Sequence, residues 1–467
     1  MERSTQTEST SPSSNANSSR TRANGDVEAQ QFQEKKGKES TLVQWDGPKD
    51  PDNPVNFSPA RKWTITVMLE LMTVSVTFAS SVFSTAAQVT AKKFHVSEEV
   101  MVLGTSLFVL GFAFGPMVFG PLSELYGRKT PLFVGFLIFA IFQIPVAVAQ
   151  NLQTIFICRF LGGFFASAPL GIVGGMLADL FNPVDRTIAV AVFAASTFIG
   201  PVAGPIVGGF ITMSYLGWRW TEYITAIMAF FFMTLGFFIV PETFESTILQ
   251  RRAKRLRFET KNWALHAKSE EQPISPRLIL RKYLLRPMQM LILEPILLLV
   301  TLYMGFIYGF LYLCFEAYPI AFQEYRRWNA GVGELPFLAI TCGVLVGCGI
   351  IIAFAKTRVE RMYKEIGSVI PEERLIPMMI GGVLLPAGMF WFAWASDPNI
   401  IWVPQVISGV FLGAGVLLIF LQGLNYIIDC YAMHSNSAIA ANSFFRSMLG
   451  AGFPMFALPM VCSPTLP

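Results

Sequence analysis

Apolar runs of about 20 residues follow one another through most of this chain, and each run is almost free of charge. A helix needs about 20 apolar residues to cross a bilayer, and in lipid every backbone polar group must find its partner within the protein. The runs therefore predict an all-α polytopic membrane protein that is embedded in the lipid bilayer. We expect eleven spans, at 63–83, 100–120, 131–149, 154–178, 187–212, 220–240, 292–318, 335–355, 376–395, 401–425 and 436–460.

The charged residues are unevenly distributed along the chain. They make up 14% of the 467 residues, against roughly 25% in a soluble domain. Residues 1–62 hold 18 of the 66 charges and residues 241–290 hold another 16. This distribution excludes an ordinary cytosolic enzyme. It predicts a disordered cytoplasmic tail at 1–60, a six-helix half at 61–241, a basic cytoplasmic linker at 242–290 and a second half at 291–467.

The positions of Lys and Arg predict the orientation. If the N-terminus is cytoplasmic, the loops on that side carry 19 Lys and Arg residues and the loops on the other side carry five. Cytoplasmic loops are enriched in these residues. The count therefore favours a cytoplasmic N-terminus, and it explains the net charge of +4 without a nucleic-acid partner.

Metal and nucleotide chemistry find no support in the sequence. The six cysteines show no zinc-type or redox spacing, and none of the three histidines has another histidine or cysteine at ligand spacing. A phosphate-binding loop of the form GxxxxGK[ST] is also missing. We therefore expect no enzyme activity, no metal and no cofactor, and an ion gradient as the energy source.

The segment GPLSELYGRK at 120–129 lies between two predicted spans. Gly120 and Gly127 permit a tight turn against a neighbouring helix end. Glu124, Arg128 and Lys129 can form charged contacts that break and remake as two halves move. We interpret the segment as a gating loop, and the alternative is a solvated loop whose basic pair fixes the topology.

A second motif lies in the run 187–212. Glycines recur every four residues and so form one smooth stripe on a helix, while two prolines remove helical hydrogen bonds. The stripe predicts close helix packing, and a functional reading adds control of leakage at a contact between the two halves. The residues of this motif are Gly200, Pro201, Gly204, Pro205, Gly208 and Gly209.

Ionisable residues inside apolar runs are functional candidates because burying a charge in a membrane is costly. They are Glu70, Arg159, Glu316 and Arg446. Neither arginine can lose its charge, so each should face water, backbone carbonyls or a carboxylate. Glu222 and Glu294 lie near span ends and are predicted to be interfacial.

Glu316 is the first candidate for a proton carrier. It follows Tyr308 and Tyr312 at successive four-residue steps, so the three side chains share one helical face. A carboxylate in an apolar cavity holds a proton readily and could also bind a cationic substrate. The alternative is a structural carboxylate at the membrane surface. Glu70 is the second candidate.

Several motifs together resemble one protein family. The segment 120–129 resembles the signature loop of the major facilitator superfamily, with Glu124 where the family has Asp. The segments 159–163 and 200–209 are similar to the buried-arginine and antiporter motifs of that family. The segments LVQWDGPKDPDNP at 42–54, PET at 241–243 and NYIID at 425–429 resemble its fungal drug:proton antiporters, which include polyamine and secondary-metabolite exporters.

This resemblance implies a multi-pass secondary transporter with two six-helix halves that exports small organic compounds by alternating access. It also implies coupling to protons, a role in multidrug resistance or metabolite efflux, and a monomer in the plasma membrane or the vacuolar membrane. An uptake symporter of the same fold is a first alternative. A truncated, non-transporting member is a second, because no apolar run follows Pro459 and the twelfth helix is missing.

Overall fold

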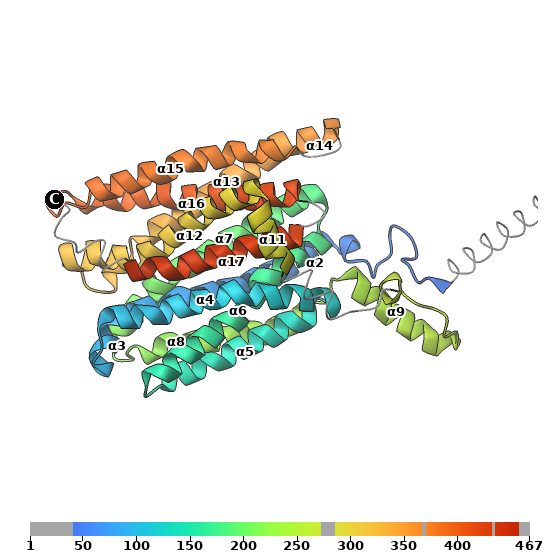
Figure 1. The fold of residues 1–467 in the computed structure, drawn as a ribbon, viewed down its shortest axis with the longest axis horizontal. Helices are drawn as coiled ribbons and strands as arrows, with labels where there is room; N and C mark the ends of the chain where they lie inside the picture. The colour runs from blue at the N-terminus through green and yellow to red at the C-terminus, as the bar shows by residue number, and fades with distance from the viewer. Residues whose placement is uncertain (1–40, 272–284, 367–369, 432–434, 457–467) are drawn as a thin grey trace, which may run out of the picture. The chain divides into compact units, whose positions relative to one another are not determined.

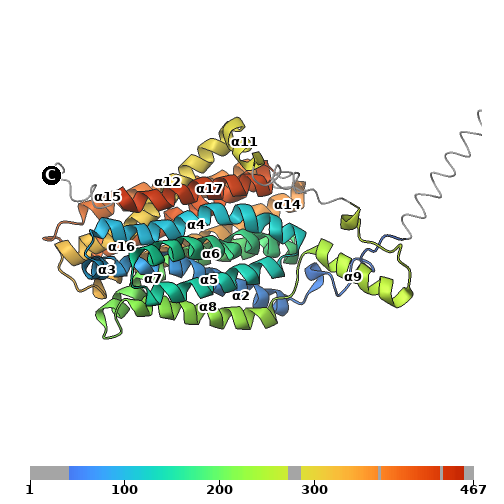
Figure 2. The same cartoon turned by 60° about the horizontal axis from the view of Figure 1, so that its bottom comes forward.

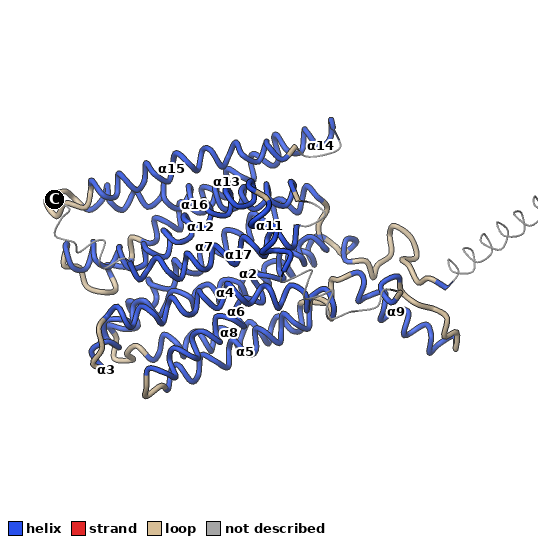
Figure 3. Tube along the Cα trace, viewed as in Figure 1, coloured by secondary structure: helices blue, strands red, loops and turns tan. Residues whose placement is uncertain are grey.

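The computed structural model describes residues 41–271, 285–366, 370–431 and 435–456. Within these ranges the chain forms helices that are joined by loops and turns (Figure 3). The α-helices are α2 Pro59–Val82, α3 Ala87–Phe94, α4 Glu98–Leu125, α5 Lys129–Val148, α6 Leu152–Leu180, α7 Pro183–Met213, α8 Arg219–Ile239, α9 Glu245–Thr260, α11 Arg286–Leu293, α12 Pro295–Pro319, α13 Phe337–Phe354, α14 Glu360–Ile366, α15 Leu375–Trp394, α16 Trp402–Cys430 and α17 Ser435–Gly452.

Ten helical segments in the described residues are long and apolar enough to cross a membrane. They correspond to the first ten predicted spans, which agrees with the predicted all-α polytopic fold. In Figures 1 and 2 the long helices of this part run alongside one another. In the first half α2 packs along α7 and α4 along α6, and in the second half α13 and α15 pack along α16.

The eleventh predicted span, 436–460, differs from the others. Its helix α17 ends at Gly452 and is followed by a 3-10 turn at Phe453–Phe456, and it is not one of the ten apolar segments. Asn442, Arg446 and several serines make it more polar, which suits a helix that packs against α12 and α4. Residues 457–467, in which the chain end was predicted to lack a further span, lie outside the described residues.

Local sequence signals explain where several helices begin. The side-chain oxygen of Ser58 accepts a hydrogen bond from the backbone N–H of Arg61 (3.4 Å) at the start of α2. Asn151 does the same for Thr154 (2.8 Å) at the start of α6. Such side chains satisfy donors that a helix N-terminus leaves unpaired. Proline also occupies the first turn of α2, α7 and α12, where its missing N–H costs nothing.

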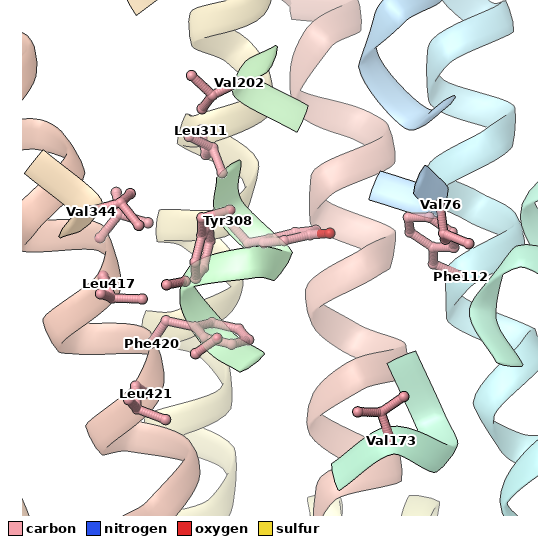
Figure 4. Packing of buried hydrophobic residues seen from close by; sticks show 14 of the residues in the cluster. Val76, Phe112, Val173, Val202, Tyr308, Leu311, Val344, Leu417, Phe420 and Leu421 are labelled. Carbon is pink, nitrogen blue, oxygen red and sulfur yellow. The ribbon is translucent and has the colours of Figure 1, made fainter. Parts of the chain in front are cut away.

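The core of the large helical part contains apolar side chains from both halves. Val76 and Phe112 of the first half and Tyr308 and Leu417 of the second belong to one buried cluster, and Figure 4 shows these four residues within it. The two halves also touch through α4 with α17 and α7 with α13. These contacts place the buried charged residues near the boundary between the halves.

The chain also contains a small second unit, drawn from 1–48 and 246–273. In its described residues, the backbone N–H of His266 donates to the carbonyl of Thr41 (3.0 Å) and its carbonyl accepts from Val43 (2.9 Å). Helix α9 covers much of the basic linker, which was predicted only as a polar segment. Ion pairs join Arg252 to Asp46 and Arg257 to Glu270.

Two predicted segments lie partly outside the described residues. Of the tail predicted as disordered at 1–60, residues 1–40 are not described, whereas 54–56 form a 3-10 turn and α2 begins at Pro59. Of the linker 242–290, residues 272–284 are not described.

Candidate functional site: a charged network between two helical halves

Arg159 lies in α6 and is 1% exposed. Its guanidinium donates hydrogen bonds to the backbone carbonyls of Gly104 (3.1 Å), Ala79 (2.9 Å) and Ser80 (3.4 Å). Carbonyls of α2 and α4 thus surround the buried cation, as the sequence predicted for an arginine that cannot deprotonate. A fixed charge in this position ties three helices of the first half to one point.

Glu222 is the acidic partner of Arg159, and the prediction that it lies at the membrane interface is wrong. Its carboxylate lies 3.5 Å from Nη1 of Arg159, and both side chains are inaccessible to solvent. The sequence placed Glu222 at the membrane interface because it occurs in the first turn of α8. The buried cation explains the difference, because an anion that neutralises it is more stable inside than an isolated charge would be. Glu294, the other residue predicted to be interfacial, is exposed.

Ser80 connects this network to the second half. Its carbonyl accepts from Arg159, and its hydroxyl forms a hydrogen bond of 2.9 Å with the hydroxyl of Tyr312 in α12. The ring of Tyr312 contacts the ring of Tyr308 at 5.1 Å between centroids. The predicted pair of tyrosines is therefore brought together, at the boundary between the halves.

Arg446 lies at the far end of this chain of contacts. Its Cζ atom is 4.6 Å from the ring centroid of Tyr308 and 4.6 Å from that of Phe420. Phe420 in turn packs edge-on against Phe198 of α7 (4.9 Å). Cation–π contacts of this kind stabilise a guanidinium that lies on the face of an aromatic ring. The second buried arginine is thus held by rings and not by the carbonyl cluster that holds Arg159.

The electrostatic surroundings of Glu316 include acidic side chains from other elements. Its carboxylate interacts electrostatically with Glu98 of α4, and Glu334 interacts with Glu316 in the same way. One carboxylate oxygen of Glu316 is buried without a hydrogen-bond partner in the described residues. Gln323 donates a hydrogen bond of 2.9 Å to Glu334. The electrostatic environment of Glu316 therefore includes acidic groups from both halves.

Glu70 is buried in α2, with 7% exposure. Its Oε2 atom lies 3.5 Å from the hydroxyl of Ser196 in α7, and Oε1 has no partner in the described residues. Cys348 of α13 interacts electrostatically with this carboxylate. Glu70 therefore lies inside the protein, where α2 packs against α7.

The glycine stripe of α7 packs against α2. A Cβ atom added at Gly200 would lie 1.9 Å from Oγ1 of Thr77, and one added at Gly204 would lie 2.2 Å from Oγ of Ser81. The predicted close packing is confirmed. The predicted contact between halves is wrong for these two glycines and for Gly208, because α2 belongs to the same half.

Pro201 and Pro205 belong to this same helix contact. The hydroxyl of Ser81 donates a hydrogen bond of 2.6 Å to the carbonyl of Pro201. Pro205, four residues later, has no N–H and cannot supply the helical bond to that carbonyl. The hydrogen bond that proline removes from α7 is therefore replaced from α2.

Gly209 does lie at a contact between the halves. Its added Cβ would lie 2.7 Å from the carbonyl oxygen of Ala330, which belongs to the second half. One turn further along α7, the sulfur of Met213 accepts a hydrogen bond of 2.8 Å from the N–H of Gly331. The halves are therefore in direct contact at the C-terminal end of α7.

The predicted gating segment is only partly a loop. Residues 120–125 form the last turns of α4, and 126–128 connect that helix to α5. Gly127 has a φ of 88°, a conformation that glycine adopts without strain. An added Cβ at Gly120 would meet nothing within 4 Å, so this glycine does not form the expected tight helix contact.

The charged residues of this segment contact other parts of the first half. Arg128 pairs with Asp179 of α6 (3.2 Å) and donates to the hydroxyl of Ser123 (3.0 Å). The backbone N–H groups of Arg128 and Lys129 donate to the carboxylate of Glu242 (2.8 and 3.2 Å). A carboxylate at the N-terminus of α5 satisfies free donors and interacts favourably with the helix dipole.

A cavity of about 270 Å³ opens beside this segment. Helices α4, α6 and α7 supply its wall in the first half, and α16 and α17 supply its wall in the second. It is mostly apolar, with charged groups at several points. The lining includes Met117, Gly120, Glu124, Arg128, Leu170, Arg186, Val190, Phe193, Arg374, Asn425, Asp429 and Ser443. The cavity lies at the N-terminal end of α7, whereas the contact at Gly209 lies at its C-terminal end.

Some of these residues were not identified as site candidates from the sequence. Ser80 and Glu334 carry no motif, and Asp179 lies within an apolar helix as the partner of Arg128. Glu242 belongs to the recognised PET triplet, but its role at the start of α5 depends on a contact distant in sequence. For Glu222 the sequence did contain a signal, because a buried arginine predicts a nearby anion and Glu222 carries such a charge.

Similarity to known proteins agrees with this architecture. A family model described as Major Facilitator Superfamily matches residues 69–454. A citrinin biosynthesis cluster MFS transporter of Monascus ruber is 54% identical over 421 residues, which cover 90% of this chain and 84% of that protein. An ascochitine biosynthesis cluster MFS transporter of Didymella fabae is 52% identical over 423 residues, which cover 90% and 82%.

Solved structures share the fold at lower sequence identity. The proton:xylose symporter XylE bound to 6-bromo-6-deoxy-D-glucose aligns with a TM-score of 0.58 and 14% identity, covering 87% of this chain and 90% of that one. The partially occluded inward-open XylE of E. coli aligns with a TM-score of 0.61 and 16% identity, covering 85% and 92%.

Proposed function

This chain belongs to the major facilitator superfamily, and from that premise we propose that it is a proton-coupled exporter of a small organic compound. The relatives from Monascus ruber and Didymella fabae are transporters of fungal secondary-metabolite clusters. Their similarity supports a secondary metabolite as the substrate, with drugs, toxins and polyamines as other compounds to test. The chain is a multi-pass membrane transporter and not an enzyme.

The observation that carries the proposal is the asymmetry along α7. At its N-terminal end the halves enclose the cavity of about 270 Å³, and at its C-terminal end Gly209 and Met213 touch the second half. Alternating access requires a central space that opens at one end while the other end is closed. The arrangement supports such a cycle, in which the halves rock about the charged network.

Proton coupling in this proposal uses Glu316, with Glu70 as a second carrier. Both side chains have a buried oxygen without a hydrogen-bond partner in the described residues. Glu316 also interacts electrostatically with the like charges of Glu98 and Glu334. A carboxylate that takes up a proton from the water at one end of the transporter and releases it at the other end can couple transport to the proton gradient.

The proposed orientation places the N-terminus and the open cavity on the cytoplasmic side of the plasma membrane. The excess of Lys and Arg in the loops of that side supports it. Glu124, Arg128 and Lys129 then lie at the cytoplasmic mouth, where their contacts would change as the halves move. A monomer contains both halves and so suffices for the cycle.

Transport in proteoliposomes tests the proposal. Purified protein is reconstituted with an imposed pH gradient, and the movement of labelled citrinin is followed. We expect movement against the proton gradient in the wild type and its loss in Glu316→Gln. Glu259→Gln removes a charge from an exposed site on α9 and should leave transport unchanged.

The other outcomes are equally informative. Citrinin that moves in the same direction as protons would indicate an uptake symporter. Undiminished pH-driven transport in Glu316→Gln would remove this residue from the coupling mechanism, and the same experiment with Glu70→Gln then tests the second carrier. Failure of the wild type to move citrinin and a panel of other metabolites and polyamines would argue against the transport proposal.

A further inference from the structure

We propose that Arg446 binds the ionised acid group of the substrate, so that the transported compounds are organic anions with an apolar body. This inference rests on the proposed function, because it takes the cavity between the halves as the transport site. The inference specifies the charge of the substrate and the residue that binds the charged group.

Arg446 is a buried cation without an acidic partner. Its side chain is 9% exposed, and its Nε–H has no hydrogen-bond acceptor in the described residues. Among those residues, no carboxylate forms an ion pair with it. The ionisable groups that interact with its guanidinium are the phenols of Tyr308 and Tyr312, which are neutral near pH 7.

Arg159 gives the comparison within the same protein. That guanidinium contacts three backbone carbonyls and the carboxylate of Glu222. Its charge is therefore neutralised and its donors are used. Arg446 has the aromatic rings of Tyr308 and Phe420 instead, and such rings do not replace a charged hydrogen-bond acceptor.

Burying the charge of Arg446 costs free energy unless a bound ligand supplies the missing anion. Arginine stays protonated in proteins, so Arg446 cannot avoid the cost by losing its charge. A buried cation is stabilised by an anion that also accepts its hydrogen bonds. A carboxylate suits the planar N–H groups of guanidinium because two parallel hydrogen bonds can form.

The cavity reaches α17 one helical turn before Arg446, which is not itself among the lining residues. Its wall on α17 includes Ala440 and Ser443, and Arg446 follows Ser443 by three residues, so the two are neighbours on the same face of the helix. Arg186 and Arg374 also line the cavity, although Arg374 is paired with Asp429 (3.0 Å). An anion that enters the cavity therefore approaches Arg446 along α17.

The remaining lining suits the apolar part of such a ligand. Met117, Leu170, Val190 and Phe193 are part of the wall. A mostly apolar pocket binds its ligand by burial, and the few charged groups at its wall orient the ligand. We therefore infer an aromatic or aliphatic acid rather than an inorganic anion.

A matched pair of ligands tests the inference by binding, without a gradient. Purified full-length protein at pH 7 is titrated with 1-naphthoate and with 1-naphthamide, which have the same ring system and differ in charge. Intrinsic tryptophan fluorescence or calorimetry reports the affinity. We expect the wild type to bind naphthoate at least tenfold more tightly, and Arg446→Gln to lose this preference.

The control is Arg361→Gln, which removes one positive charge from an exposed position on α14 and should keep the preference. Equal affinities in the wild type, undetectable binding of naphthoate, or a preference that persists in Arg446→Gln would overturn the inference. If Arg446→Gln does not fold, Arg446→Lys replaces it. Lysine offers a point charge in place of the planar fork, so naphthoate affinity should fall at least threefold and naphthamide affinity should not change. An unchanged naphthoate affinity would again overturn the inference.

The binding result is separable from the transport result. A wild type that prefers naphthoate but shows no pH-driven transport would retain the anion site and reject proton coupling. Transport of citrinin driven by the pH gradient, without any preference for the naphthoate anion, would support proton coupling and reject the anion site.

Discussion

The hydroxyl of Ser81 in α2 donates a hydrogen bond of 2.6 Å to the carbonyl oxygen of Pro201 in α7. This carbonyl has no helical donor because Pro205 lacks an N–H. The replacement bond requires the two helices to lie very close, and the glycines of α7 provide that approach. The prolines and glycines of this motif therefore depend on each other.

Removing the Ser81 hydroxyl should destabilise the protein. In Ser81→Ala the carbonyl of Pro201 is left buried without a donor, which costs roughly 1–3 kcal/mol. Thermal unfolding in detergent should show a lower Tm than the wild type. Ser84→Ala is the control, because the hydroxyl of Ser84 bonds to Ser81 within the same chain segment (2.9 Å). Equal shifts in the two variants would contradict the explanation.

Gly204→Ala should also lower the Tm, through overpacking. The new methyl group would lie 2.2 Å from Oγ of Ser81 and 2.9 Å from the backbone nitrogen of Val82. Overpacking of this kind costs roughly 1–3 kcal/mol. Gly349→Ala is the matched control, because nothing lies within 4 Å of an added Cβ there. That control should be neutral or stabilising by about 1 kcal/mol, and a lower Tm in it would speak against the steric explanation.

Gly209→Ala should change conformation rather than stability. Its methyl group would press on Ala330 of the second half, at 2.7 Å. A steric cost of about 1 kcal/mol in the closed state shifts the ratio of states roughly fivefold. Spin labels on Tyr215→Cys and Asn399→Cys, in a protein without its native cysteines, should report longer distances. Gly204→Ala acts within one half and should leave the distances unchanged, so equal behaviour of the two variants would refute the assignment.

Glu222→Gln should be among the most destabilising single changes. It leaves the buried charge of Arg159 without its anion, and breaking a buried pair in this way costs roughly 3–5 kcal/mol. The Tm and the yield of folded protein should both fall. Glu259→Gln removes a charge from an exposed site and should have little effect. A Tm equal to that of the wild type would show that the three carbonyls alone stabilise Arg159.

The small unit should become less stable as the pH rises. Hydrogen bonds to the carbonyl of Ala264 and to Glu271 hold the pKa of His266 above its ordinary value of 6.5. Because the folded pKa exceeds the unfolded one, the stabilisation is complete below about 6.5 and is lost as the pH rises through the folded value. Hydrogen exchange at Val43 and His266, corrected for intrinsic rates, should be faster at pH 8.5 than at pH 6. His266→Asn should abolish this difference, and a difference that survives would exclude the imidazole as its cause.

Much of the fold could be predicted from the sequence, because the lipid environment makes each apolar run a helix. The spans at 100–120 and 131–149 correspond to α4 and α5. The glycine spacing in α7 correctly predicted a close contact. It could not predict the partner, because a periodicity defines the face of a helix and not the helix that packs on it.

The charged site was less predictable. The need of Arg159 for carbonyls or a carboxylate follows from the chemistry of arginine. The position of Glu222 near a helix end predicts an interfacial residue, but distance from a helix end is a poor measure of burial. Glu316 was grouped with Tyr312 by helical spacing, whereas the structure adds Glu98 and Glu334 from other elements. Interactions between segments that are distant in the sequence decided both cases.

The surroundings of Arg159 have a mechanical consequence. One side chain on α6 is fastened to the backbone of α2, the backbone of α4 and a side chain of α8. Helices joined in this way cannot slide past one another without breaking several buried interactions at once. The first half should therefore move as a rigid body relative to the second half. Substitutions that weaken these contacts should make both the inward-open and the outward-open state less well defined, and should not favour either one.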